Sequence, residues 1–197
     1  MINNNMVSFM GILNKWANYT KKTKWLVLGL VIASLLSCQQ SEWKKFSSSE
    51  GRFSVLIPGV PTEKIIKVNT KAGIVDLHIL QLEGTEFNYL AVSYGDYPKE
   101  TVTKENINKI LDGARDGAVS NVHGKLISEL IITLDNYPGR EIKVEIPNGK
   151  HILISRIYLV RNRLYSISLI THKNNIFTTE LYDKAHKFFD SFQLMSS

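Results

Sequence analysis

The chain has 197 residues, of which 44% are hydrophobic and 21% are charged, a composition typical of a folded globular protein. This composition excludes collagen-like, disordered and multi-pass membrane proteins. The formal charge is +6, but four lysines and no acidic residue precede Cys38, so the part from Cys38 onward carries only +2. So weak a net charge argues against a nucleic-acid partner, because phosphate backbones are bound through strongly basic surfaces.

The first 37 residues have the organisation of an export signal. Lysines at positions 21, 22 and 24 precede an apolar and small-residue stretch over residues 25–37. This stretch is shorter than the roughly 20 apolar residues that a membrane-spanning helix needs. It ends in Leu35-Leu36-Ser37-Cys38, which resembles the lipobox of bacterial lipoproteins.

The lipobox resemblance implies cleavage before Cys38 and acylation of its thiol, which would attach the protein to a membrane. Cys38 is the only cysteine of the chain, so an internal disulfide is excluded. The alternative is an uncleaved signal anchor, and both alternatives place the domain outside the cytoplasm, in a periplasm or a thylakoid lumen. We expect a lipoprotein signal peptide over 1–37, a tether over 38–45 and a single domain over 46–197.

Strands dominate the first half of the expected domain. Phe53, Val55 and Ile57 alternate on one face, and Pro58 and Gly59 end that strand. The β-branched stretches on either side of the short connection at residues 70–73 predict a hairpin. In all, four strands are expected here, over residues 52–57, 62–69, 74–82 and 88–94.

Two segments with apolar residues at helical spacing predict helices over residues 103–122 and 175–191. Gly113 and Gly117, four residues apart, indicate that the first helix packs closely against a sheet. The connections between consecutive predicted strands are short, and short connections favour antiparallel pairing. We therefore expect an α+β fold with an antiparallel β-sheet covered by helices. Four more strands are expected between the helices, over residues 125–134, 140–146, 150–160 and 163–170.

The sequence contains no familiar catalytic or metal-binding motif. Its five histidines, at positions 78, 123, 151, 172 and 186, lack the spacing of a zinc site. We therefore expect no catalytic residue, no metal and no cofactor, and a protein that is not an enzyme. The alternative is an envelope hydrolase or metal-dependent enzyme whose site is assembled from dispersed residues such as His151, Asp135 and Glu141.

One cluster has the composition of a binding surface. Arginine and tyrosine are enriched where proteins bind one another, and both gather in the last predicted hairpin. The alternative is that these are ordinary outward-facing residues of a hairpin. The candidate partner-binding residues are Arg156, Tyr158, Arg161, Arg163 and Tyr165.

Four short segments of the sequence resemble those of a known family. They are Gly51-Arg52-Phe53-Ser54-Val55-Leu56-Ile57-Pro58-Gly59, Tyr137-Pro138-Gly139-Arg140-Glu141, Arg163-Leu164-Tyr165 and Phe188-Phe189-Asp190-Ser191-Phe192. In these segments the chain resembles cyanobacterial-type bacterial lipoproteins that carry a PsbP-like domain. The resemblance implies an α/β/α sandwich around an antiparallel sheet. It also implies a non-enzymatic accessory protein that docks on a membrane protein complex, with photosystem II as the complex in PsbP itself.

Replacing Cys38 with serine tests the lipid anchor. The variant lacks the thiol that receives the acyl group, so we expect loss of metabolic labelling by a fatty acid and accumulation of an unprocessed precursor. The measurement is the radioactivity of the immunoprecipitated protein, with Ser37→Ala as a control that keeps a small residue before the cysteine. Label that persists in the serine variant would contradict the assignment.

Overall fold

The computed structural model describes residues 42–70, 73–84, 87–147 and 149–195. Ser41–Ser197 forms one compact unit. Cys38 and the expected signal peptide lie outside the described residues, so lipid attachment stays a prediction. Within the described ranges no helix has the length and apolar character that crossing a membrane requires.

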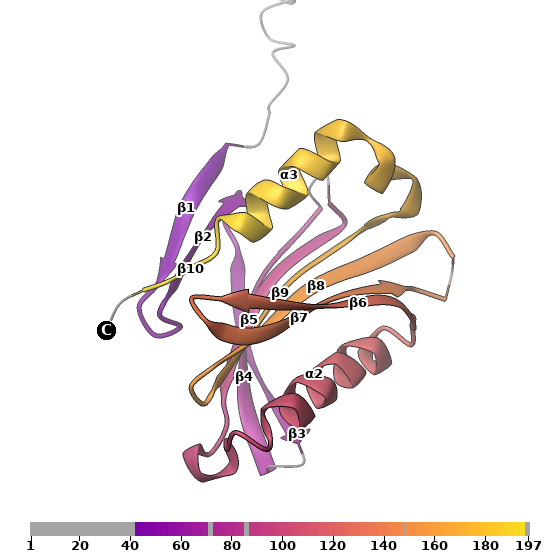
Figure 1. The fold of residues 1–197 in the computed structure, drawn as a ribbon. Helices are drawn as coiled ribbons and strands as arrows, with labels where there is room; N and C mark the ends of the chain where they lie inside the picture. Colours follow the sequence, from indigo (N-terminus) through magenta and orange to yellow (C-terminus); the bar gives the residue numbers. More distant parts are fainter. Residues whose placement is uncertain (1–41, 71–72, 85–86, 148, 196–197) are drawn as a thin grey trace, which may run out of the picture. The chain divides into compact units, whose positions relative to one another are not determined.

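A seven-stranded sheet forms the centre of the domain (Figure 1). Its strand order is β3-β4-β5-β9-β8-β7-β6, and every neighbouring pair is antiparallel. β5 and β9 pair in the interior of the sheet and so join the two halves of the chain. The strands are β3 (Thr62–Thr70), β4 (Gly73–Glu83), β5 (Tyr89–Asp96), β6 (Lys125–Leu134), β7 (Tyr137–Glu145), β8 (His151–Val160) and β9 (Arg163–His172).

A second, smaller sheet contains both ends of the domain. Its three strands are β1 (Trp43–Ser48), β2 (Phe53–Pro58) and β10 (Gln193–Leu194). β2 pairs with β1 on one side and with β10 on the other, so the first and last strands are held by the same neighbour. This second sheet was not predicted from the sequence.

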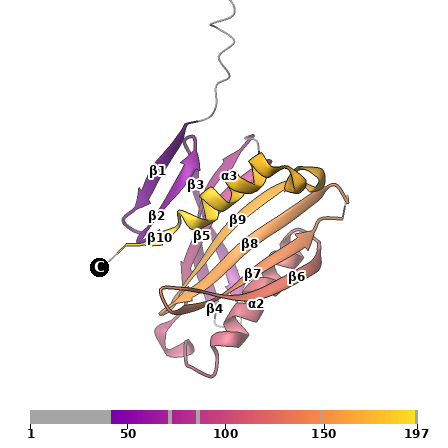
Figure 2. The ribbon, with the colours of Figure 1, turned by 45° about the horizontal axis from the view of Figure 1, so that its top comes forward.

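Two helices cover opposite faces of the large sheet (Figures 1 and 2). α2 (Ile107–Asn121) packs on β7 and β8, and α3 (Thr179–Asp190) lies beside β2. Short 3-10 helices precede them, η1 (Lys99–Thr101) before α2 and η2 (Lys173–Phe177) before α3. The expected α+β class, an antiparallel sheet covered by helices, is confirmed.

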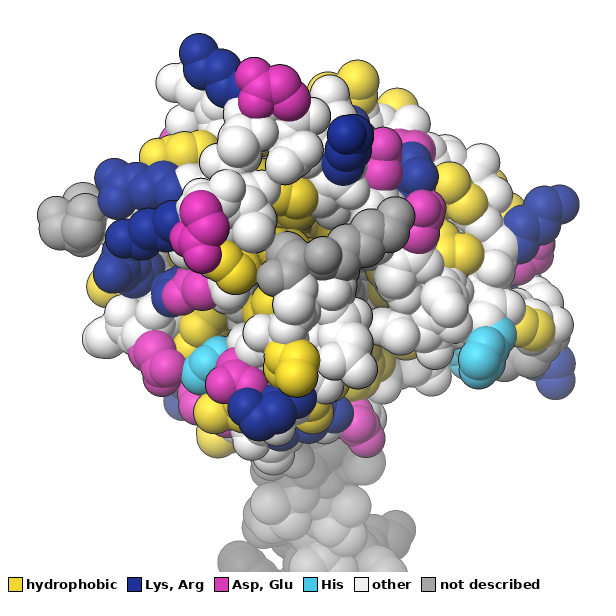
Figure 3. Space-filling model, turned by 90° about the horizontal axis from the view of Figure 1, so that it is seen from below, with side chains coloured by type: hydrophobic (Ala, Val, Ile, Leu, Met, Phe, Trp, Pro, Cys, Tyr) yellow, Lys and Arg dark blue, Asp and Glu magenta, His cyan; other side chains and the backbone are white. Residues whose placement is uncertain are grey.

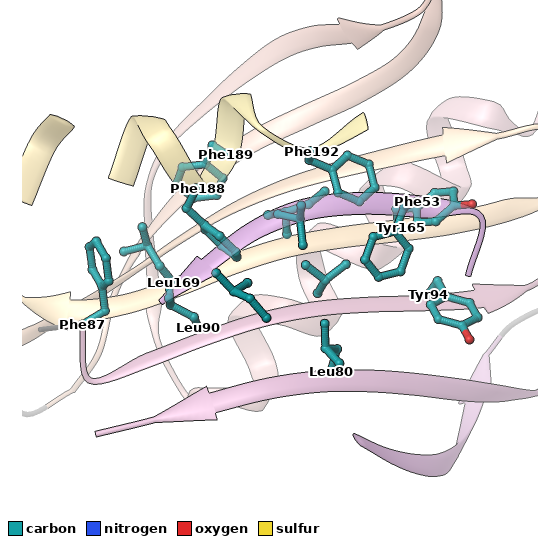
Figure 4. Packing of buried hydrophobic residues seen from close by; sticks show 14 of the residues in the cluster. Phe53, Leu80, Phe87, Leu90, Tyr94, Tyr165, Leu169, Phe188, Phe189 and Phe192 are labelled. Carbon is teal, nitrogen blue, oxygen red and sulfur yellow. The ribbon is translucent and has the colours of Figure 1, made fainter. Parts of the chain in front are cut away.

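The main core lies between the large sheet, the small sheet and α3, and Phe53 belongs to a group of aromatic residues at one end of it, with Phe192, Tyr165 and Tyr94 (Figure 4). The Phe53 side chain is 0% exposed. Its ring centroid is 5.4 Å from that of Phe192, 6.1 Å from that of Tyr94 and 6.3 Å from that of Tyr165. Aromatic pairs at such distances contribute about 0.5–1.5 kcal/mol each beyond the burial of their surface.

A second core fixes α2 to the other face of the sheet. It consists of the buried residues Leu111, Ile142, Val144, Leu153, Ile157 and Leu159. Beside it, the buried Arg140 side chain contacts Glu129 of β6 at 3.1 Å and donates a hydrogen bond to Asn108 of α2 at 2.9 Å. Arg115 of α2 reaches the same Glu129 at 2.9 Å. Charged groups therefore fasten α2 along the side that faces β6 and β7.

Part of the expected tether belongs to the fold. Residues 43–45 lie in β1 and pair with β2, and Trp43 packs against the main core. The Lys187 ammonium group also lies 5.2 Å from the centre of the Trp43 ring. The prediction was wrong here because an edge strand with few apolar residues has the composition of a linker.

The expected close packing of Gly113 and Gly117 is also wrong. A methyl group placed on either glycine would meet no other heavy atom within 4 Å. The close approach occurs instead at Gly124, where a Cβ would collide with Val144. Both helices begin later than predicted, α2 at Ile107 and α3 at Thr179, because a turn occupies residues 104–106 and the 3-10 helix η2 occupies Lys173–Phe177.

Phe53→Ala tests the role of the main core. Removing a fully buried phenylalanine leaves a cavity among four aromatic rings, and we expect the free energy of unfolding to fall by about 3–5 kcal/mol. The measurement is urea denaturation followed by tyrosine and tryptophan fluorescence. Tyr182→Ala is the control, since the Tyr182 side chain is 55% exposed and its loss should change stability by less than about 0.5 kcal/mol.

Candidate functional site

Two concave surfaces are candidates for a functional site. The first, which we call the arginine hollow, has a volume of about 490 Å³ and lies where the β8–β9 turn meets the β6–β7 turn. The second, which we call the helix groove, has a volume of about 660 Å³ and lies between α2 and the large sheet. Both volumes are in the range of ligand sites in proteins, about 300–1,000 Å³.

Arg163 and Tyr165 line the arginine hollow, but their polar groups are engaged within the protein. The Arg163 guanidinium makes two parallel hydrogen bonds to the Asp96 carboxylate, of 2.6 Å and 2.7 Å, and donates a third to the backbone carbonyl of Glu50. Its Cζ also lies 4.9 Å from the centre of the Tyr94 ring. The Tyr165 hydroxyl donates to the Gly51 carbonyl at 2.7 Å. These contacts fasten the loop before β2 to the large sheet.

Arg156 joins two elements in a similar way. It donates to Glu141 of β7 and to Asp190 of α3, each at 2.6 Å. Its guanidinium also lies over the Phe189 ring at 4.9 Å. Tyr158, on the neighbouring part of β8, is 6% exposed. Both residues therefore serve the attachment of α3 and β7 to β8.

Arg161 differs from the other four predicted residues. It occupies the β8–β9 turn with φ of 57°, and its side chain is exposed at the rim of the arginine hollow. Arg52 and Lys99, also exposed, line the same hollow, together with Asp135. Four of the five predicted residues thus lie on one face of β8 and β9, and Arg161 lies in the turn between these strands. Of the five, only Arg161 is exposed. Its part in partner binding stays a prediction.

The three residues named for a dispersed enzyme site do not converge. Asp135 lines the arginine hollow beside Val160, the last residue of β8, whereas His151 is the first. The two ends of this ten-residue strand are roughly 30 Å apart at a rise of about 3.3 Å per residue. Glu141 is paired with Arg156. Among the described residues, no group of three or more His, Cys, Asp or Glu side chains could hold a metal ion.

The helix groove has an apolar lining that the sequence analysis missed. Its wall is the stripe of α2 that carries Gly113 and Gly117, and its floor is the α2 face of β3, β4, β5, β8 and β9. The floor contains small residues, Gly95, Ser93 and Ser166, flanked by the apolar side chains of Val68, Val75, Leu77, Ile157 and Leu164. The paired glycines were the signal in the sequence, but their spacing alone does not distinguish close packing from an open groove.

Figure 3 shows the side of the molecule on which α2 lies. Hydrophobic side chains are visible there between lysine, arginine and acidic side chains. Lys109 is the one charged residue that lines the helix groove within the described part of the chain. It is exposed and lies in the first turn of α2, close in sequence to the polar lining residues Asn106 and Thr101. The groove is therefore mostly apolar, with its charged residue Lys109 near the start of α2 and the uncharged Asn121 at the other end.

Similarity to known proteins is found at the level of structure and not of sequence. No protein family and no curated protein sequence matches the chain. Among solved structures, the chain is similar to the solution structure of cyanobacterial PsbP (CyanoP) from Synechocystis sp. PCC 6803. The two share 12% identity with a TM-score of 0.47, over 80% of this chain and 95% of that one. What either candidate site binds must therefore be inferred from its own side chains.

Acid titration tests the Asp96–Arg163 pair. The hydrogen bonds from Arg163 are the largest cause that lowers the pKa of Asp96 below its ordinary value. The unfolded chain therefore binds a proton to this carboxylate at a higher pH than the folded protein does, and the contribution of Asp96 to stability is lost as the pH falls below about 4. We expect the unfolding free energy of Asp96→Asn to fall less steeply than that of the wild type between about pH 5 and pH 2, by urea titrations at each pH. Equal slopes would contradict the role given to the pair.

Proposed function

We propose that the protein is a lipid-anchored extracytoplasmic binding protein, without catalytic activity, that docks on a membrane protein complex. Lipid attachment at Cys38 would keep the domain at the membrane surface, where its partner is also held. The resemblance of the sequence to PsbP-like proteins makes a photosystem II-type assembly the first complex to examine.

The observation that carries this proposal is the exposed apolar edge of the large sheet. β6 is an edge strand with one unpaired side. Ile131 is 80% exposed, Leu130 is 58% exposed and Ile127 is 49% exposed. Large apolar side chains gathered on a strand edge are rare in proteins that act alone, because such edges promote association.

The opposite edge of the same sheet is better protected. β3 also exposes two isoleucines, Ile65 and Ile66, but the charged residues Glu63, Lys64 and Lys67 flank them. Charges on an edge strand discourage pairing with another chain. Residues 130–134 of β6 are uncharged. An unpaired backbone between apolar side chains is the arrangement to which a partner can add a strand.

The arginine hollow lies at the end of this edge. Asp135 follows β6 directly and lines the hollow together with Arg161 and Arg52. A partner strand on β6 would end beside these charged groups, which favour acidic residues at that end of the partner. In this proposal Arg161 contacts the partner beside the apolar docking edge, which is the role predicted for it from the sequence.

Affinity capture from detergent-solubilised membranes tests the proposal. Ile131→Lys places a charge in the middle of the proposed docking edge without touching either core, so we expect the recovered complex to fall at least tenfold. Ile65→Lys is the matched control on the other edge and should recover the same amount as the wild type. Arg161→Glu should reduce capture to a lesser extent, because it alters only the end of the surface.

Two results would contradict docking through β6. One is equal recovery of the same complex by Ile131→Lys and by the wild type. The other is capture of no membrane complex by the wild type from membranes of its own source. Thermal unfolding of each variant is measured in parallel, so that loss of fold is recognised separately from loss of binding.

A further inference from the structure

The helix groove is a concave surface separate from the β6 edge. It follows α2 from Asn106 to Asn121, a length of about 22 Å at 1.5 Å per residue, and faces the β3–β4–β5 half of the sheet. The ion pairs and the second core hold α2 to the opposite half, on β6, β7 and β8. The groove exists because the helix is fastened along one side only.

Side chains of the described residues do not fill the groove. Gly113 and Gly117 present only backbone toward it, and a methyl group on either would have free space around it. On the sheet, Ser93 and Ser166 bring only short side chains to the groove, whereas Val75 already covers Gly95, where a Cβ would lie 2.8 Å from the Val75 side chain. The result is a long trough with apolar walls, which suits a narrow, flexible, apolar ligand.

Charge distinguishes the two ends of the trough. Lys109 lies in the first turn of α2, and no acidic residue of the described chain lines the groove. No ion pair of Lys109 is present among the described residues. The amide of Asn106, the hydroxyl of Thr101 and the phenol of Tyr97 lie at the same groove as further polar groups. The volume of about 660 Å³ is that of a drug-sized ligand, which favours one acyl chain over a two-chain lipid.

We propose that the helix groove binds a free long-chain fatty acid. The acyl chain lies along Gly113 and Gly117 between α2 and the sheet, and the carboxylate lies at Lys109. Binding of this kind is independent of docking through β6, because the two surfaces share no residue.

Photo-crosslinking in membranes that contain the full chain tests this site. The probe is palmitate with a diazirine in its tail, and mass spectrometry of the crosslinked peptides locates the attachment. We expect saturable labelling of residues on α2 and on β4 or β5, which unlabelled palmitate prevents. Absence of saturable labelling, or labelling confined to other elements, would overturn the proposal.

Variants separate the apolar trough from its charged end. Gly113→Leu and Gly117→Leu fill the trough, and leucine favours a helix more than glycine does, so the fold should survive and labelling should fall at least tenfold. Ser120→Leu, on an exposed part of α2 outside the groove, is the matched control and should label as the wild type does. Undiminished labelling of both glycine variants would refute the site.

The charged end is tested with Lys109→Glu and a neutral probe. We expect labelling of this variant by the diazirine palmitate to fall at least tenfold. Labelling by the methyl ester of the same probe should equal that of the wild type. Lys104→Glu, which does not line the groove, should change neither. Equal labelling of Lys109→Glu and the wild type by the acid would overturn the placement of the carboxylate.

Discussion

The packing around Phe53 is the constraint on which the rest of the structure depends. Its ring contacts rings from β1, β5, β9 and the segment after α3, so one side chain connects both sheets and both ends of the domain. The hydrogen bond from Tyr165 to the Gly51 carbonyl fixes the turn that leads into β2. Once this cluster is formed, one face of the large sheet is closed and any binding must use the other face, the edges or the strand ends.

The two helices then have different consequences. α3 packs Leu181, Phe188 and Phe189 into the main core. Leu111 is the buried residue of α2, which packs mainly on β7 and β8, while Arg140 and Glu129 hold its flank. The uncovered half of that face is the origin of the helix groove, and the uncovered strand β6 is the origin of the docking edge. Both proposed sites therefore follow from incomplete coverage of one sheet.

Several elements could be predicted from the sequence because their signals are local. The strand over residues 125–134 has the predicted bounds, and the Arg161-Asn162 hairpin fixes the register of β8 against β9. The candidate site was predicted less well. Successive side chains of a strand point to opposite faces of its sheet, so this alternation along β8 and β9 places Arg156, Tyr158, Arg163 and Tyr165 on one face of the large sheet. Whether that face is solvent or core depends on α3 and β2, which are distant in the sequence.

The sequence by itself determined the α+β class, the antiparallel hairpins and the charge balance of the domain, because spacing, turn residues and composition act over a few residues. Tertiary structure alone decided that the arginines of β8 and β9 are paired with Asp96, Glu141 and Asp190, and that Gly113 and Gly117 border an open groove. The physical reason is that burial and ion pairing depend on which surfaces meet. In this protein the surfaces that meet belong to segments far apart in the sequence: the Ser191 hydroxyl accepts a hydrogen bond from the backbone of Leu56, 135 positions away.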